Sequence, residues 1–152
     1  MKTAAFTLLA LLAGIAHGAG DFSALPQYLP AGQWRLDYDR QAKIRLLHYR
    51  KADHGSRDTC IGADPRNMIL DWLADKNCQI EQDTLFGKSW RLQGSCRVKW
   101  TREPIPVEIE ILLADGATFV MNTRTPQGGF LEFQEHATAT RVGATCKAKR
   151  AD

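Results

Sequence analysis

Residues 78–101 have the sequence CQIEQDTLFGKSWRLQGSCRVKWT, and this stretch decides the fold. From residue 89 on, apolar or small side chains alternate strictly with polar ones, which predicts a strand with one buried face. Gly87 lies midway between Cys78 and Cys96, so a hairpin that turns at Gly87 places the two cysteines opposite each other. Opposed residues of an antiparallel pair have Cα atoms about 4.5 to 5.5 Å apart, which a disulfide can span. The stretch therefore predicts a disulfide-bonded β-hairpin.

Four cysteines, Cys60, Cys78, Cys96 and Cys146, allow three ways of forming two disulfides. With Cys78 joined to Cys96 across the hairpin, elimination joins Cys60 to Cys146. A zinc finger requires close pairs of Cys or His, and a thioredoxin-type redox site requires C-x-x-C, but neither spacing occurs in this sequence. Structural disulfides are therefore favoured, since a redox role requires the Cys60–Cys146 bond to be strained and exposed.

The first twenty residues have the features of an export signal. A basic start at Met1-Lys2 precedes an apolar run that is shorter than the ~20 residues of a membrane-spanning helix, so we expect cleavage and no membrane anchor. Residues 1–20 are thus the expected signal peptide, residues 21–146 a single disulfide-bonded β domain, and residues 147–152 a flexible tail. Export brings the cysteines into the oxidising compartment that disulfides require, so a periplasmic or secreted location is expected.

Alternation also predicts the first strand, in which Trp34, Leu36 and Tyr38 share one face. Residues 43–50 are predicted to form the second strand, although the pattern leaves its buried face ambiguous. The stretch at 51–59 is polar and contains a glycine, which predicts a loop.

One helix is predicted where Asp64 can cap the first turn and Pro65 can occupy the first helical position. Ile69, Trp72 and Leu73 share one face of this helix at helical spacing. We therefore expect Trp72 to anchor the helix on a sheet.

A second hairpin is predicted at Asp115-Gly116, a type I′ turn that would place Leu112 opposite Phe119. A last long strand is predicted over residues 130–142, after a turn rich in proline and glycine. Together the elements predict a mainly β (α+β) fold, a curved antiparallel sheet or open barrel of about seven strands with one helix packed on it and two disulfides.

Four features lie in a familiar order along the chain. The segment LPAGQW at 29–34 opens the first strand, Cys60 lies just ahead of the helix, Cys78 and Cys96 flank the hairpin, and RVGATC at 141–146 closes the last strand. In this order the chain resembles the domain of unknown function 3617, a family of exported bacterial proteins. The resemblance implies an exported, disulfide-bonded β domain of a Gram-negative bacterium, and it carries no established activity or catalytic residue.

Candidate acid–base residues are few. Asp53 and His54 are neighbours in a polar segment, while Glu132, Gln134 and His136 share one face of the last predicted strand. A hydrolase-type enzyme with a Glu/His pair (Glu132 and His136) or an Asp/His pair (Asp53 and His54) is the alternative hypothesis, although solvated outer faces explain both groups more simply. The sequence has no metal-ligand spacing, phosphate-binding glycine loop or haem-attachment motif, so it predicts no metal and no cofactor.

Large aromatic residues are a stronger indication than the charged ones. Trp34, Tyr38, Trp90 and Trp100 all fall on inward strand faces and are the candidate ligand-binding residues. A curved sheet whose interior is not filled can enclose an apolar small molecule, whereas the alternative is that these rings simply fill the core.

The net charge of +3 is small and dispersed, which predicts no nucleic-acid partner. The favoured hypothesis is a non-catalytic binding or interaction module of the periplasm. Its partner would be an apolar small molecule or another periplasmic protein.

The disulfide framework makes a simple prediction. A thiol assay on the unfolded but unreduced protein should find no free thiol, because all four cysteines are paired. Two or more reactive thiols would contradict the framework.

Overall fold

The computed structural model describes residues 21–99 and 101–146. The predicted signal peptide at 1–20, Trp100 and the predicted tail at 147–152 lie outside the described residues. No helix in the described part of the chain is long and apolar enough to cross a membrane. The elements, in chain order, are η1 (Phe22–Ala24), α1 (Leu25–Tyr28), β1 (Gly32–Ile44), β2 (Tyr49–Ile61), α2 (Pro65–Asp75), β3 (Cys78–Phe86), β4 (Ser89–Cys96), β5 (Ile105–Leu113), β6 (Thr118–Arg124) and β7 (Leu131–Gly143).

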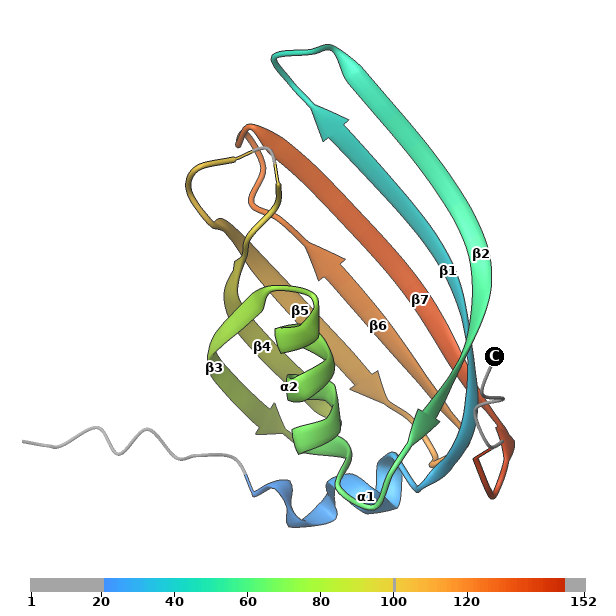
Figure 1. The fold of residues 1–152 in the computed structure, drawn as a ribbon. Helices are drawn as coiled ribbons and strands as arrows, with labels where there is room; N and C mark the ends of the chain where they lie inside the picture. Colours follow the sequence, from blue (N-terminus) through green and yellow to red (C-terminus); the bar gives the residue numbers. More distant parts are fainter. Residues whose placement is uncertain (1–20, 100, 147–152) are drawn as a thin grey trace, which may run out of the picture.

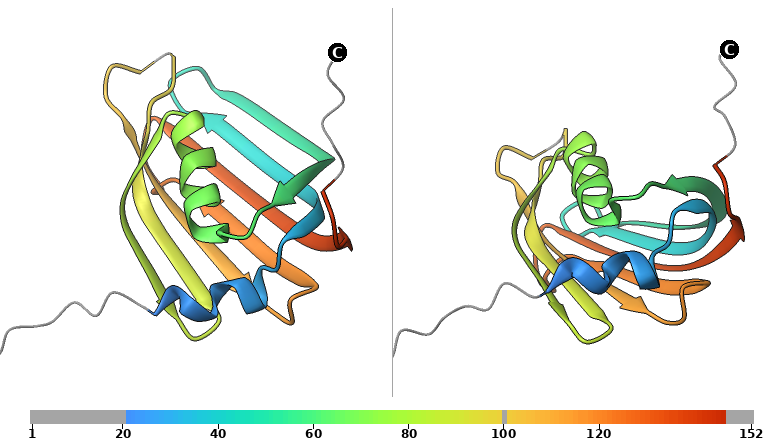
Figure 2. Two further views of the ribbon diagram at one scale, coloured as in Figure 1. Left: turned by 60° about the horizontal axis from the view of Figure 1, so that its bottom comes forward. Right: turned by 90° about the horizontal axis from the view of Figure 1, so that it is seen from below.

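Within the described residues, seven strands form one antiparallel sheet in the order β2-β1-β7-β6-β5-β4-β3. The sheet is open, with β2 and β3 as its edges, and this confirms the predicted fold class. It curls into a U, and α2 lies across the mouth of the U on the concave side (Figures 1 and 2). Because α2 follows β2 and precedes β3, this helix connects the two edges of the sheet.

The hairpin of β3 and β4 forms as the sequence predicts, with one addition. Gly87 has a φ of +58°, a left-handed conformation that glycine adopts without strain, and the strands pair from Phe86 and Ser89 onward. A register shift between Ile80 and Gln82 adds one residue to β3. Without this bulge the two cysteines would be offset by one residue. With it, Cys78 lies directly opposite Cys96, and the two are bonded.

The second disulfide joins Cys60 of β2 to Cys146, which follows β7, with Cα atoms 5.4 Å apart. Between them runs β1, since Gln33 pairs with Cys60 on one side and with Gly143 on the other. The bond therefore ties the edge strand to the segment after the third strand of the sheet. Both pairings predicted from the sequence are confirmed.

The prediction for residues 43–59 was wrong. Residues 45–48 form a turn, and the supposed loop at 51–59 is the middle of β2, paired with β1 along its whole length. Its polar composition suits an edge strand, in which one face remains exposed and cross-strand ion pairs such as Arg35–Asp58 (3.1 Å) form. Polarity alone therefore did not distinguish an edge strand from a loop.

The predicted register of β5 and β6 was also wrong, by one residue. Leu112 lies opposite Val120 and not Phe119. Only Gly116 of the turn has a positive φ, whereas a type I′ turn needs two such residues, and the Asp115 carboxylate accepts hydrogen bonds from the amides of Ala117 and Thr118. The longer turn directs Phe119 into the core.

Helix α2 begins as predicted. The Asp64 side chain accepts a hydrogen bond from the Asn67 amide at 3.1 Å, and Pro65 occupies the first turn. Leu73 is buried against the sheet, while Ile69 and Trp72 are half-buried.

The core lies on the concave side of the sheet, where the inward-facing side chains of β1 and β3–β7 pack against one another. Trp34 and Trp90 are fully buried in it, and each contacts a phenylalanine: Trp34 with Phe119 at 5.2 Å and Trp90 with Phe22 at 5.9 Å between ring centroids. One end of the concave side is covered by α1, whose Leu25 is fully buried. This end of the U is therefore closed by packed side chains.

The two disulfides should differ in their effect on stability. Cys60 and Cys146 are 86 residues apart, while Cys78 and Cys96 are 18 apart. Replacing the long-range pair with serines should lower the free energy of unfolding by about 4.5 kcal/mol and replacing the short-range pair by about 3 kcal/mol, as loop-closure entropy requires. Urea unfolding of the two double variants measures the difference, and a larger loss for the short-range pair would contradict this account.

Candidate functional site

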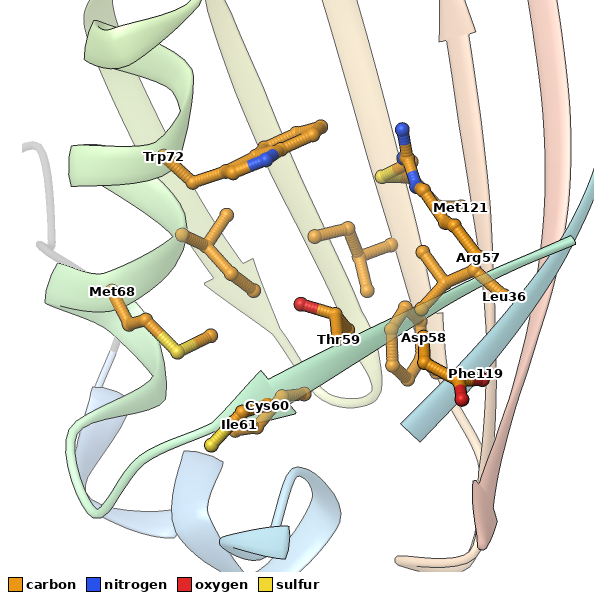
Figure 3. A pocket seen from close by; sticks show the side chains of 12 residues that line it. Leu36, Arg57, Asp58, Thr59, Cys60, Ile61, Met68, Trp72, Phe119 and Met121 are labelled. Carbon is orange, nitrogen blue, oxygen red and sulfur yellow. The ribbon is translucent and has the colours of Figure 1, made fainter. Parts of the chain in front are cut away.

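Two neighbouring cavities lie between α2 and the concave face of the sheet. Their volumes are about 270 and 420 Å³. Three side chains line both cavities, namely Arg57 of β2, Trp72 of α2 and Met121 of β6. Figure 3 shows the first cavity, with the Trp72 indole reaching from the helix toward Arg57 at the edge of the sheet. The two cavities thus form one candidate binding site, divided at Trp72.

The first cavity is mostly apolar because alternation along the strands brings one face of each strand to it. Leu36 of β1, Ile111 of β5 and Phe119 of β6 form its floor, while Met68 and Ile69 of α2 face them. Helical spacing places these two residues on the same side of α2 as Trp72.

The second cavity lies beyond Trp72, toward the C-terminal end of α2. Its walls include Ile109 of β5, Thr123 of β6 and Phe133 of β7, together with the Cys78–Cys96 disulfide. The disulfide closes one side of this cavity.

Both ends of α2 are tied to the sheet by disulfides. Cys60 precedes the helix by five residues, and Cys78 follows it by three. Each cysteine is bonded to the sheet or to the segment that follows it, so the helix cannot move far from the concave face. The covalent framework therefore holds the wall of the site in place.

Arg57 is the central polar residue of the site. Its guanidinium lies 5.0 Å from the centre of the Trp72 ring and 5.7 Å from that of Tyr38, within the range of cation–π attraction. It also forms an ion pair with Glu135 of β7, with 3.8 Å between Nη2 and Oε1. The Glu135 side chain is only 10% exposed and that of Arg57 is 35% exposed. Two aromatic rings and one carboxylate thus hold this cation at the division between the cavities.

A second ion pair lies beside the first. Arg40 of β1 stands directly opposite Asp53 of β2 and bonds to its carboxylate, while its guanidinium lies 5.0 Å from the Tyr38 ring. The hydrogen bond from Arg40 lowers the pKa of Asp53, so this carboxyl is ionised at neutral pH. Tyr38 therefore contacts both Arg40 and Arg57.

The aromatic residues proposed from the sequence are placed differently from one another. Trp34 and Trp90 are buried in the core and line neither cavity. Tyr38 lies beside the site, where it contacts Arg40 and Arg57 but lines neither cavity. Trp100 is outside the described residues. The aromatic residue that lines both cavities is Trp72, which the sequence indicated only as the anchor of the helix.

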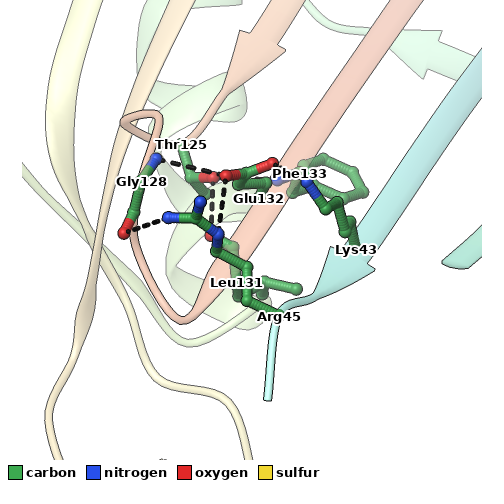
Figure 4. A network of polar contacts seen from close by, with 7 residues as sticks. All are labelled: Lys43, Arg45, Thr125, Gly128, Leu131, Glu132 and Phe133. Carbon is green, nitrogen blue, oxygen red and sulfur yellow. Dashed lines mark hydrogen bonds and ion pairs between the residues drawn. The ribbon is translucent and has the colours of Figure 1, made fainter. Parts of the chain in front are cut away.

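The residues of the alternative acid–base pairs do not meet. Glu132 and His136 share the outer face of β7 but are four residues apart, or about 13 Å along a strand. Glu132 instead accepts hydrogen bonds from Lys43 Nζ and the Gly128 amide, both at 3.2 Å (Figure 4), and these lower its pKa. His136 bonds to Asn122 through Nδ1 at 2.7 Å.

The Asp53–His54 pair is separated for a different reason. Successive residues of a strand point to opposite faces, so Asp53 lies on the concave face with Arg40 while His54 is exposed. Among the described residues, no group of three or more His, Cys, Asp and Glu side chains is arranged to hold a metal ion.

No family model matches the chain, and no curated protein matches it. The resemblance to the domain of unknown function 3617 stays a prediction.

The Arg57–Glu135 pair gives a stability prediction. Glu135→Gln should lower the free energy of unfolding by about 1–2 kcal/mol, because it leaves the Arg57 charge half-buried without its carboxylate. Glu108→Gln is the matched control, since Glu108 forms a shorter ion pair with Arg124 (2.7 Å) on the exposed outer face, where such pairs contribute about 0–1 kcal/mol. Chemical denaturation measures both variants, and equal losses would show that Glu135 has no special role.

Proposed function

We propose that the protein is a periplasmic binding module that holds an apolar or amphiphilic small molecule between α2 and the concave face of the sheet. The observation that carries this proposal is the pair of cavities beneath α2. The second cavity, at about 420 Å³, falls within the range of about 300–1,000 Å³ that is typical of small-molecule sites.

The lining favours a ligand with an apolar body. Apolar side chains form most of the walls, and a ligand that covers them removes apolar surface from water at about 25 cal/mol per Å². A chain-like ligand fits best, because the two cavities are neighbours and share the side chains of Trp72 and Met121.

The charged groups of the site favour an acidic head group on that ligand. The second cavity is lined by Arg40, Arg57 and Lys76 but by only one acidic residue, Glu135. Arg40 is paired with Asp53, and Arg57 is paired with Glu135. The positive charge of Lys76, which forms no ion pair in the described part of the chain, is therefore in excess and attracts a carboxylate or phosphate at short range. We therefore infer an anionic amphiphile such as a fatty acid.

Binding rather than chemical conversion is supported by the state of the polar groups. Asp53 is ionised beside Arg40, and Glu135 is paired with Arg57. A general acid or base needs a pKa near the working pH and a free position toward the reacting group. These carboxylates instead hold two arginines in fixed positions.

The compartment is inferred from the covalent framework. All four cysteines are in disulfides, which persist in oxidising surroundings outside the cytosol. The resemblance to the domain of unknown function 3617 supports the periplasm of a Gram-negative bacterium as this compartment.

Filling the cavities should abolish binding. Met121 lines both, so Met121→Trp should weaken the binding of a dansyl-labelled fatty acid at least roughly tenfold by occupying the volume of the ligand. Thr138→Trp is the matched control, because it places the same ring on the exposed outer face of the neighbouring β7. Fluorescence titration measures both affinities.

Overpacking costs about 1–3 kcal/mol, so thermal unfolding must first show that Met121→Trp is folded. If it is not, Thr123→Phe is the alternative variant, because Thr123 is half-buried and lines the second cavity, which a larger side chain would fill. Native mass spectrometry of the protein from its own periplasm should also find a bound lipid-like molecule. Equal affinity in the folded filling variants and the control, or no binding by the unaltered protein, contradicts the proposal.

A further inference from the structure

The turn between β1 and β2 exposes large apolar side chains at the tip of a long hairpin. Leu46 is 78% exposed and Leu47 70% exposed, and Tyr49 beside them is also exposed. We call residues 43–51 the hairpin tip. Apolar side chains of this size are rarely left together in water without a binding partner.

The charges of the hairpin tip are all of one sign. Lys43, Arg45, Arg50 and Lys51 are basic, and residues 43–51 contain no Asp or Glu. Lys43 and Arg45 share the carboxylate of Glu132, at 3.2 and 3.6 Å. Neither Arg50 nor Lys51 forms an ion pair with an acidic residue in the described part of the chain. The tip therefore presents excess positive charge around its leucines.

Two of these cations are held in an unfavourable position. Lys43 and Arg50 are directly opposite each other across β1 and β2, and like charges in such positions destabilise a hairpin. A hollow beside them is lined by Lys43, Arg50 and Lys51 together with four uncharged residues and Glu132. Glu132 already neutralises Lys43, so Arg50 and Lys51 are the cations of this hollow without a carboxylate, and an anion can bind beside them.

The hairpin tip is both prominent and fixed. It projects beyond the neighbouring turns at the same end of the sheet (Figure 1). Arg45 ties its base to the turn between β6 and β7, through a hydrogen bond to the Gly128 carbonyl at 3.1 Å and the ion pair with Glu132 (Figure 4). That turn carries a further exposed aromatic residue, Phe130. These contacts hold Arg45, which precedes the exposed leucines, against the neighbouring turn.

We propose that the hairpin tip docks on an anionic lipid bilayer. Leu46 and Leu47 enter the interface between headgroups and acyl chains, Tyr49 lies at headgroup level, and the basic residues bind the lipid phosphates. A projecting tip surrounded by cations fits a deformable, negatively charged surface better than the matching concave site that a protein partner would need. Docking of this kind is reversible and does not anchor the chain.

If the proposed function holds, the hairpin tip also indicates the route by which the ligand reaches its cavity. The second cavity is lined by Leu131 and Phe133, and these residues pair with Ile44 and Ala42 at the tip end of β1. The cavity thus extends toward the end of the sheet that would face the bilayer. An amphiphile could pass between the membrane and the site without crossing the length of the domain.

Vesicle co-sedimentation of the mature, disulfide-bonded protein tests the docking. It should bind vesicles made of equal parts phosphatidylglycerol and phosphatidylcholine, bind pure phosphatidylcholine far more weakly, and be released by high salt. Leu46→Ser/Leu47→Ser should lower the partition coefficient by roughly tenfold or more, since both leucines leave the interface. Arg50→Gln/Lys51→Gln should lower it by about twenty-fivefold, at about fivefold for each charge.

Phe86→Ser is the matched control. Phe86 is 88% exposed at the turn between β3 and β4, at the opposite end of the sheet, and its replacement should leave vesicle binding unchanged. Equal binding by the tip variants and the control, or no preference for phosphatidylglycerol, overturns the proposal. Titration with the dansyl-labelled fatty acid in vesicle-free solution separates the two hypotheses, because the tip variants should keep full affinity for it whether or not they bind vesicles.

Discussion

The structure depends on one constraint: α2 spans the two edges of an open sheet and is tied down at both ends by disulfides. Cys60 lies just before the helix and Cys78 just after it, and their partners, Cys146 and Cys96, belong to the opposite flanks of the sheet. A domain of this size buries only about two thirds of its unfolded surface, so it has limited core to hold a helix by packing alone. The covalent links allow α2 to stand over the concave face without filling all the space beneath it.

Much of the fold could be predicted because its strands obey strict alternation. The hairpin of β3 and β4 and the first turn of α2 follow from local patterns at Gly87 and Asp64. Two of the predictions were wrong. The strand character of 51–59 comes from pairing with β1, and the register of β6 comes from the Asp115 carboxylate, which lengthens the turn. Both depend on interactions that a hydrophobicity pattern does not record.

The sequence predicted fewer residues of the candidate site than elements of the fold. The sequence indicated correctly that a large aromatic residue lines the site. Trp34 and Trp90, however, are fully buried in the core. Trp72 lines the cavity because α2 lies over the concave face of the sheet. Arg57 and Glu135 are polar residues on the concave face, and a polar residue in an alternating strand ordinarily indicates the outer face. The place of Arg57 further depends on the strand character of β2, which its polar composition conceals.

The two ends of the U-shaped sheet are built differently: one is closed by packed side chains, and the other lies beside the second cavity. At one end, α1 covers the concave side and places Leu25 and Leu29 fully in the core, so no ligand can enter there without unpacking them. At the other end the second cavity reaches the first residues of β7, next to the hairpin tip with its leucines and cations. In the amphiphile carrier proposed above, the closed end would confine exchange to the end that carries the hairpin tip.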